Sequence, residues 1–363
     1  MKKLKVAFSL LMVCAMLISV LSGCGQPAPV SSSAPASGSA PASGAAPDSS
    51  VPSEQESMNI VFVPKLIGIP WFNQMENGLK DFAKEAGNMS ISVSGPAEAD
   101  PVQQAKVLED VVATKPDCII VVPNDTKVLE PILKKAREAG IIVITQEAST
   151  VENADADIEF LIMEQTGKQY GEALAKNMGG KGGYAIMVGG LTVESHNARA
   201  DAAVAYLKGK YPDMYEVTSR VEGSESVEQA HDKTLELIKA HEDLKGILYI
   251  GSNGALGGAA AVREKNLAGK FVIAGTSLPS QAKPYLKDGA ISDNLIGSPY
   301  NIGKATGYIV QTLKANNMDI NSVKEVPIYE ATLADNTLII KGKVITFHTD
   351  ANVTYENADS FGF

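Results

Sequence analysis

The stretch from Asn59 to Phe72, NIVFVPKLIGIPWF, contains an apolar run, a lysine and an aromatic pair in that order. The run from Ile60 to Val63 is short and β-branched, which is typical of a buried parallel strand. Lys65 stands where such a strand ends, and ligands of open α/β sheets bind at the carboxyl ends of strands. We therefore predict that Lys65, Trp71 and Phe72 belong to a ligand site. The alternative is a solvated lysine beside two core aromatics.

Strand and helix patterns alternate along the rest of the chain. Each short apolar run is followed by an amphipathic helical pattern, which is the signature of βαβ units in a parallel sheet. The same rhythm starts again after residue 165. The later runs are CIIVVP (118–123), IIVIT (141–145), YAIMV (184–188), ILYI (247–250) and FVIA (271–274).

This repetition predicts an α/β fold with two similar, doubly wound parallel-sheet lobes. Several chain crossings join the lobes, so we expect a multi-strand hinge with a ligand cleft between them. The N-terminal lobe is predicted to comprise residues 58–164 and 299–322. The C-terminal lobe is predicted to comprise residues 165–298 and 323–363.

The beginning of the chain has the order of a secretory signal, predicted here as residues 1–23. Three lysines within the first five residues precede an apolar run, residues 6–20, that is shorter than the roughly 20 residues of a bilayer span. Its end, LSGC, resembles a bacterial lipoprotein signal, which implies that Cys24 becomes the lipidated N-terminus. The alternative is an ordinary signal followed by an incidental cysteine.

Residues 24–57 are dominated by Pro, Ala, Ser and Gly. Such a composition buries too little apolar surface to order itself, so we predict a disordered tether. With a lipid on Cys24, this tether would hold the folded part outside the cell membrane.

Charge and the reactive residue types exclude several classes of function. The net charge of −10 argues against a nucleic-acid partner. The four histidines include no pair at i,i+4 spacing and have no cysteine nearby, so no metal site is predicted. No Walker loop or G-x-S-x-G elbow is present, and Cys118 has no disulfide partner within the mature fold. We predict no enzyme activity and no cofactor.

A glycine-rich segment, GSNGALG at 251–257, follows an apolar strand and precedes a helix. That context can hold a phosphate. However, its spacing is G-x-x-G-x-x-G rather than the dinucleotide pattern G-x-G-x-x-G, and it lies deep in the second lobe. We favour a tight turn that offers Ser252 and Asn253 to the cleft.

Polar residues also follow the other predicted strands. Carboxylates, amides and hydroxyls suit a polyhydroxylated ligand, with aromatic rings covering its apolar faces. The alternative is that these residues are helix N-caps, which we favour for Asp125 and Ser277. Glu is a poor N-cap. The candidate ligand-binding residues at these positions are Glu147, Ser195, His196, Ser252, Asn253 and Thr276.

From Asn59 to Phe363 the chain resembles the type I periplasmic-binding-protein family, in the sugar-binding branch that supplies ABC importers. The resemblance rests on IVFVPKLIGIPWFNQMENG, on IIVITQE and on VITFHTDANVTYENADSFGF. These segments look most like autoinducer-2-binding proteins and their rhamnose-binding relatives. The resemblance implies hinge closure on a small ligand and delivery to a membrane permease.

The resemblance also implies roles for individual residues. Lys65 matches a lysine that contacts the furanosyl ligand of autoinducer-2 binders, and Glu147 stands in place of an aspartate. Ser195 and His196 replace an Asp-Gln pair, and the Pro of a Pro-x-Ala step is missing near Ser252. The implied ligand is therefore a rhamnose, pentose or autoinducer-2 type of molecule.

Three functional hypotheses follow from these observations. The first is a monomeric, lipid-anchored substrate-binding protein of an ABC importer, which binds a small sugar-like ligand. The second is a surface receptor that hands the same kind of ligand to a membrane sensor. The third is a surface glycosidase using paired carboxylates, for which Glu147 and Glu194 are the candidates. A LacI-type regulator is excluded because a signal and a linker occupy the place of its helix-turn-helix.

Overall fold

The computed structural model describes residues 57–326, 338–347 and 350–363. The predicted signal, Cys24 and the tether lie outside these residues. Two seven-stranded sheets, mostly parallel, belong to one unit that runs from Glu54 to Phe363. The predicted α/β fold with two similar lobes is thereby confirmed.

The first sheet has the order β12-β13-β5-β4-β3-β1-β2. Its central strands are parallel and buried, as their continuous apolar runs predict. Only the β12–β13 pair within it is antiparallel. The strands are β1 (Met58–Val63), β2 (Met89–Val93), β3 (Cys118–Val121), β4 (Ile142–Gln146), β5 (Ala156–Glu159), β12 (Ile339–Lys341) and β13 (Val344–Thr346).

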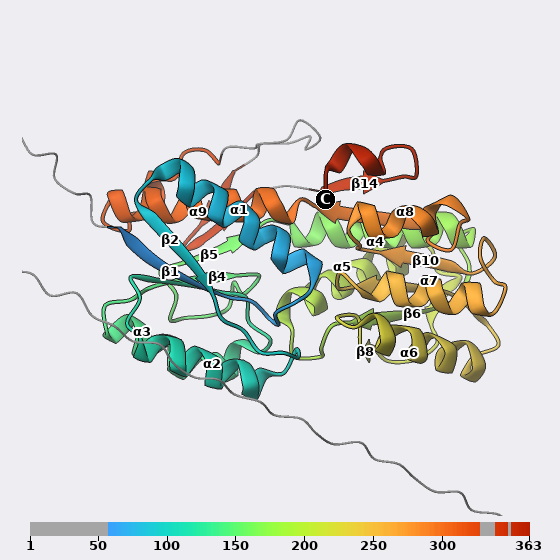
Figure 1. Cartoon of the computed structure of the whole chain (residues 1–363). Coiled ribbons are helices and arrows are strands. Elements are labelled where there is room, and N and C mark those ends of the chain that lie inside the picture. The colour runs from blue at the N-terminus through green and yellow to red at the C-terminus, as the bar shows by residue number, and fades with distance from the viewer. Residues whose placement is uncertain (1–56, 327–337, 348–349) are drawn as a thin grey trace, which may run out of the picture. The chain divides into compact units, whose positions relative to one another are not determined.

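Helices cover both faces of this sheet (Figure 1). On one face, α1 (Pro70–Ala86) packs against α9 (Pro299–Ala315). Their close approach depends on glycine, because a Cβ at Gly78 would collide with the carbonyl oxygen of Tyr300. The other face carries α2 (Pro101–Ala113) and α3 (Thr126–Glu138).

The second sheet has the order β14-β11-β10-β9-β6-β7, and β8 also pairs with β6. One face packs against α4 and α5, and the other against α6 and α7. Its strands are β6 (Gly182–Val188), β7 (Met214–Glu216), β8 (Val221–Glu222), β9 (Leu244–Ile250), β10 (Val272–Gly275), β11 (Asp293–Gly297) and β14 (Asp350–Val353). The helices are α4 (Met163–Met178), α5 (Glu194–Lys210), α6 (Val227–Ala240), α7 (Gly254–Glu264) and α8 (Pro279–Lys287), with short 3-10 turns at Ile320–Ser322 and Ala358–Phe361.

The chain passes between the sheets after β5, after β11 and between β13 and β14. The assignment of all of 323–363 to the C-terminal lobe does not hold for residues 339–346. Here β13 pairs with β5 in the first sheet, and only β14 joins the second sheet. The physical reason is that β5 is fully buried, so the hydrogen-bonding groups on its outer edge need a partner strand.

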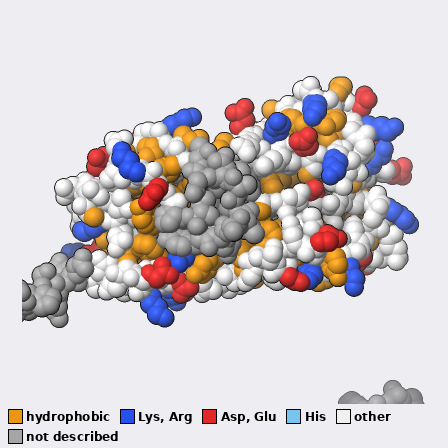
Figure 2. All heavy atoms as spheres, turned by 90° about the horizontal axis from the view of Figure 1, so that it is seen from above, with side chains coloured by type: hydrophobic (Ala, Val, Ile, Leu, Met, Phe, Trp, Pro, Cys, Tyr) orange, Lys and Arg blue, Asp and Glu red, His pale blue; other side chains and the backbone are white. Residues whose placement is uncertain are grey.

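The surface seen in Figure 2 carries Lys and Arg side chains interspersed with Asp and Glu. Neither sign of charge dominates this face outside the grey atoms. Among the described residues, no helix combines the length and the apolar character that crossing a membrane requires.

Candidate functional site

A narrow cavity lies where the two lobes meet. Its free volume is about 30 Å³, which is room for about one water molecule, so a larger ligand requires the lobes to part. Residues from both lobes line it: Lys65, Ile69, Trp71, Phe72, Glu147, Phe160, His196, Arg199, Glu225, Gly251, Ser252 and Thr276.

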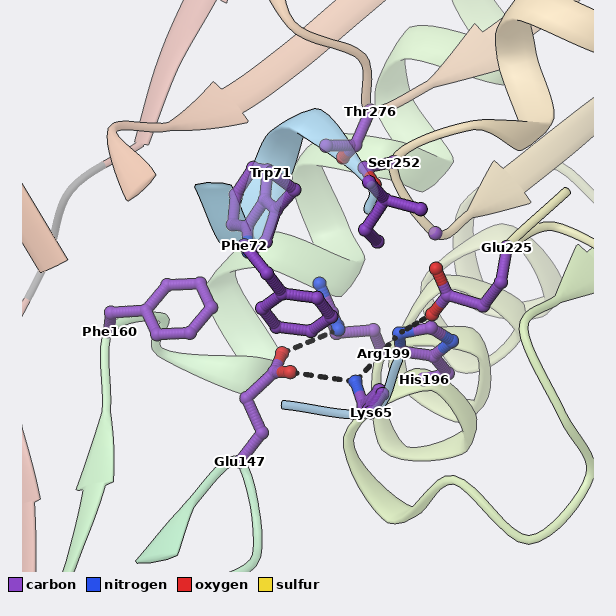
Figure 3. A pocket seen from close by; sticks show the side chains of 12 residues that line it. Lys65, Trp71, Phe72, Glu147, Phe160, His196, Arg199, Glu225, Ser252 and Thr276 are labelled. Atoms are coloured by element: carbon purple, nitrogen blue, oxygen red, sulfur yellow. Dashed lines mark hydrogen bonds and ion pairs between the residues drawn. The ribbon is translucent and has the colours of Figure 1, made fainter. Parts of the chain in front are cut away.

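A buried carboxylate with two cationic partners forms the charged part of the cavity. Lys65 Nζ donates to Glu147 Oε2 at 2.9 Å, and Arg199 Nη2 donates to Glu147 Oε1 at 2.8 Å. Lys65 follows β1, Glu147 follows β4, and Arg199 lies on α5 of the second lobe. Figure 3 shows these contacts converging on the one carboxylate. The Glu147–Arg199 pair thus joins the two lobes directly.

The backbone of Glu147 is strained. Its φ of 55° lies in the left-handed region, which residues other than glycine rarely adopt. Such conformations persist where surrounding contacts over-determine them, and they gather at ligand sites. The two ion pairs of the side chain, together with the bond from Glu147 N to Ile158 O, supply those contacts here.

Burial and the neighbouring positive charges have opposite effects on the charge state of Glu147. Burial raises the pKa of this carboxyl, but the charges of Lys65 and Arg199, together with hydrogen bonds from Lys65 and Ser195, outweigh burial and leave the pKa below its usual value. Glu147 is therefore ionised at neutral pH. It can accept charge-assisted hydrogen bonds from ligand hydroxyls.

His196 sits in the first turn of α5 and is neutral. Its Nδ1 accepts a hydrogen bond from Gly189 N at 3.0 Å, so the ring proton lies on Nε2. Nε2 is 3.3 Å from Lys65 Nζ and 3.6 Å from Glu225 Oε1. Burial, followed by the positive charges of Lys65 and Arg199, holds the pKa of His196 well below its usual value.

Glu225 is the second carboxyl of the cavity. Burial raises its pKa, and the charge of Glu147 raises it further, although Lys65 and Arg199 oppose this. The cavity thus presents one carboxylate held in its ionised form and one carboxyl shifted toward its protonated form. Both carboxyls can accept hydrogen bonds from ligand hydroxyls.

Aromatic rings from the first lobe form the apolar part of the cavity. Trp71 and Phe160 lie with their ring centroids 6.1 Å apart, and Phe72 packs against Phe62 at 6.2 Å. Figure 3 shows Trp71, Phe72 and Phe160 next to one another, beside the ion-paired group. A ring face flanked by hydrogen-bonding groups suits a sugar-like molecule with one apolar face.

Comparison with known proteins identifies the family. The family model described as "Periplasmic binding protein domain" matches residues 60–317, which is more than half of the chain. The protein belongs to this family. Its members are binding proteins, which decides against the surface glycosidase hypothesis.

Three relatives illustrate the likeness. The D-ribose/D-allose-binding protein of Pseudomonas aeruginosa is 26% identical over 244 residues, which are 65% of this chain and 76% of that protein. A solute-binding protein from Clostridium phytofermentas with bound L-rhamnose has a TM-score of 0.76 at 21% identity, covering 84% of this chain and 98% of its own. LsrB from Clostridium saccharobutylicum in complex with AI-2 has a TM-score of 0.74 at 21% identity, covering 84% and 100%.

Seven of the nine residues predicted from sequence as ligand contacts line the cavity of this periplasmic binding protein. Ser195 does not; its carbonyl oxygen accepts a hydrogen bond from Arg199 Nε at 3.1 Å, so it orients that side chain. Asn253 does not either; its Nδ2 donates to Glu225 O at 2.9 Å. The seven residues are Lys65, Trp71, Phe72, Glu147, His196, Ser252 and Thr276.

Three important lining residues were missed by sequence reasoning. Arg199 lies one helical turn after Ser195 and therefore on the same face of α5, a spacing that could have found it. Glu225 follows β8, which at two residues is too short to show a strand pattern in the sequence. Phe160 follows β5 at the first crossing between the lobes.

The structure separates the helix caps from the other strand-end residues. Asp125 caps α3, with its side chain accepting from the backbone N–H groups of Lys127 and Val128. Ser277 is not a cap, because α8 begins only after Leu278 and the hydroxyl of Ser277 donates to Thr276 O.

The glycine-rich segment packs tightly against its neighbours. A Cβ at Gly254 would collide with Ser224 Oγ, and one at Gly257 with the carbonyl oxygen of Val227. Gly251 has a φ of 142°. The glycines are thus explained by the tight turn and by the contact between α7 and α6, in agreement with the structural interpretation of the segment.

A wider groove of about 640 Å³ adjoins the cavity and shares Ile69 and Glu225 with it. Both lobes contribute to the groove, and Thr192 Oγ1 donates across it to Asn124 O at 3.0 Å. Within the described part of the chain, no cluster of three or more His, Cys, Asp or Glu side chains could hold a metal ion.

Proposed function

We propose that this protein is an extracytoplasmic substrate-binding protein of an ABC importer that binds a small sugar or sugar-like ligand by hinge closure. The observation that carries the proposal is the cavity between the lobes. It combines an ionised carboxylate, two cations, a neutral imidazole and three aromatic rings. Family membership supports the same function.

The ligand class we propose is a rhamnose, pentose or autoinducer-2 type of molecule. Glu147, Arg199 and Lys65 offer hydrogen bonds to adjacent hydroxyls, while the aromatic rings cover an apolar face of the ligand. The ligands named for the similar proteins, D-ribose, D-allose, L-rhamnose and AI-2, are all small and hydroxylated. These comparisons support the class and not one member of it.

Closure of the lobes is part of the proposed mechanism. A cavity of about 30 Å³, with the inter-lobe ion pair of Arg199 and Glu147 at its edge, has no room for a sugar until the lobes part. The ligand therefore binds while the lobes are apart and stabilises the closed form. The closed form would then be presented to the transmembrane subunits of the permease.

We further propose that a lipid on Cys24 anchors the protein to the outer side of the cell membrane. The residues between Cys24 and Ser57 would provide reach toward the permease. We propose that the protein acts as a monomer. The surface-receptor hypothesis uses the same ligand and the same closure, and differs only in the membrane partner.

A thermal-shift screen tests the ligand. The folded protein is heated with L-rhamnose, D-ribose, D-allose, D-arabinose and autoinducer-2, each at millimolar concentration. A ligand present at 100 times its Kd should stabilise the protein by about 2.7 kcal/mol, a shift of several degrees in Tm. If every member of the panel leaves Tm unchanged, the proposed ligand class is wrong.

A further inference from the structure

A second set of contacts joins the lobes outside the ligand cavity. Glu194, the first residue of α5, reaches from the second lobe to the loop that follows β4 in the first. Its Oε1 accepts hydrogen bonds from Ser149 Oγ at 3.2 Å and from Thr150 N at 3.3 Å. Its Oε2 accepts a third from Thr150 Oγ1. Glu194 does not line the cavity.

These contacts connect the two elements that carry the central ion pair. Ser149 and Thr150 lie two and three residues after Glu147, while Glu194 lies five residues before Arg199 on the same helix. Fixing the start of α5 against this loop therefore fixes the distance at which Arg199 meets Glu147. The carboxylate of Glu194 makes three hydrogen bonds to the first lobe.

We propose that Glu194 is a positioning residue that holds the cleft closed without touching the ligand. This inference rests on the proposed function, because it assigns a role in the closure of the same site. The contacts of Glu194 can form only when the lobes are together, so they favour the closed state over the open one.

Loss of a positioning contact has a different effect on binding from loss of a ligand contact. A contact that forms only in the closed state stabilises the closed, ligand-loaded protein by the same free energy whichever ligand it holds. Loss of a contact that stabilises closure should therefore weaken all ligands by one common factor. Loss of a contact to the ligand weakens each ligand according to the group that was contacted.

The test compares Glu194→Ala and Thr150→Val with a matched control, Glu228→Ala. Glu228 also stands in the first turn of a second-lobe helix, α6. Glu228→Ala and Glu194→Ala therefore each remove one acidic side chain that interacts favourably with a helix dipole. In the described part of the chain, Glu228 makes no hydrogen bond or ion pair with the first lobe. Circular dichroism and Tm first establish that each variant is folded.

The fluorescence of Trp71 reports whether the lobes are open in the absence of ligand. Trp71 is the single tryptophan of the chain, and it lines the cavity. In the full-length protein without ligand, acrylamide should quench Trp71 more strongly in Glu194→Ala than in the wild type or Glu228→Ala. Equal quenching in all three proteins would overturn the proposal, whether or not a sugar has been found.

Ligand release provides the second measurement. For each sugar that stabilises the wild type in the thermal screen, Glu194→Ala should dissociate about tenfold faster, equivalent to about 1.4 kcal/mol. The factor should be the same for all sugars, and the double variant Glu194→Ala/Thr150→Val should be no worse than Glu194→Ala alone. Unequal factors would instead make Glu194 a ligand contact. Failure of every sugar to bind the wild type would contradict the proposed function and leave the quenching result to decide the role of Glu194.

Discussion

The two lobes have the same construction but face the cavity with different chemistry. All of the aromatic rings that line the cavity come from the first lobe, together with Lys65 and Glu147. The second lobe supplies Arg199, His196, Glu225 and two hydroxyl groups, and no Phe, Tyr or Trp side chain among the described residues. A ligand with one apolar face should therefore turn that face toward the first lobe. Its remaining hydroxyls then meet the polar groups of the second lobe.

The difference is sharpest between the two carboxyls. Glu147 of the first lobe lies between two cations, and its pKa is lowered. Glu225 of the second lobe faces only a neutral imidazole at close range, and burial raises its pKa. Similar side chains in similar folds are thus given opposite tendencies by their neighbours. Exchanging each for its neutral amide separates the two roles.

Glu147→Gln should have the largest effect of the changes considered. It removes the carboxylate that pairs with both Lys65 and Arg199, and breaking a buried ion pair costs about 3–5 kcal/mol. We expect the sugar identified by the thermal screen to bind at least roughly a hundredfold more weakly. Isothermal titration calorimetry measures the change.

Glu225→Gln is the matched comparison for this prediction. Because the near partner of Glu225 is the neutral ring of His196, 3.6 Å away, and not a cation, the amide should cost no more than about 1 kcal/mol. If both amides weaken binding equally, the contrast between the two lobes is wrong. Circular dichroism of each variant excludes loss of folding as the cause.

The effect of His196 on the pH dependence of stability should be smaller than the effect of Glu147→Gln on binding. The pKa of His196 is depressed in the folded protein, so below about pH 6.5 the unfolded chain binds a proton that the folded one does not. Stability contributed by the neutral ring is present above that pH and is lost as the pH falls, by up to about 1.4 kcal/mol per pH unit. In His196→Gln this part of the loss should vanish.

The control for this prediction compares the dependence of unfolding free energy on pH in the wild type and in His196→Gln. Asp157, whose pKa burial raises to about 7, acts in the opposite direction, since its contribution to stability is lost as the pH rises from 3.8 toward 7. It is present in both proteins and cancels in their difference. Urea unfolding between pH 5 and 8 gives both profiles. Parallel profiles would mean that His196 titrates normally in the fold.

Most of the cavity could be predicted from the sequence, because the carboxyl ends of parallel strands lie along one edge of a sheet. The apolar β-branched runs mark the strands, and so Lys65, Glu147 and Thr276 could be placed without coordinates. Arg199 lies within a helix, so no strand end marks it, and its place one helical turn after Ser195 is a weaker signal. Its partner Glu147 lies 52 positions away, and an arginine in a polar helix has the same sequence signature as a solvated one.

The C-terminal segment shows a different limit. Strands as short as β13 and β14 show little hydrophobic alternation in the sequence. Which sheet each of them joins depends on which edge strand has unpaired hydrogen-bonding groups. β5 takes β13 and β11 takes β14, although only a few residues separate the two strands. The pairing depends on tertiary context that a local pattern does not contain.

Thr276→Val tests the polar side of the second lobe with the smallest expected effect. The hydroxyl of Thr276 lines the cavity, but it already bonds to Tyr170 and donates to Leu295 O at 2.9 Å. A hydroxyl engaged in this way has little left to offer a ligand, so the isosteric valine should weaken binding by less than about 1 kcal/mol, or roughly fivefold. Calorimetry with the same sugar measures this, with Ser252→Ala as the comparison. A loss as large as that of Glu147→Gln would mean that Thr276 exchanges its internal bonds for the ligand, and that the second lobe rearranges on closure.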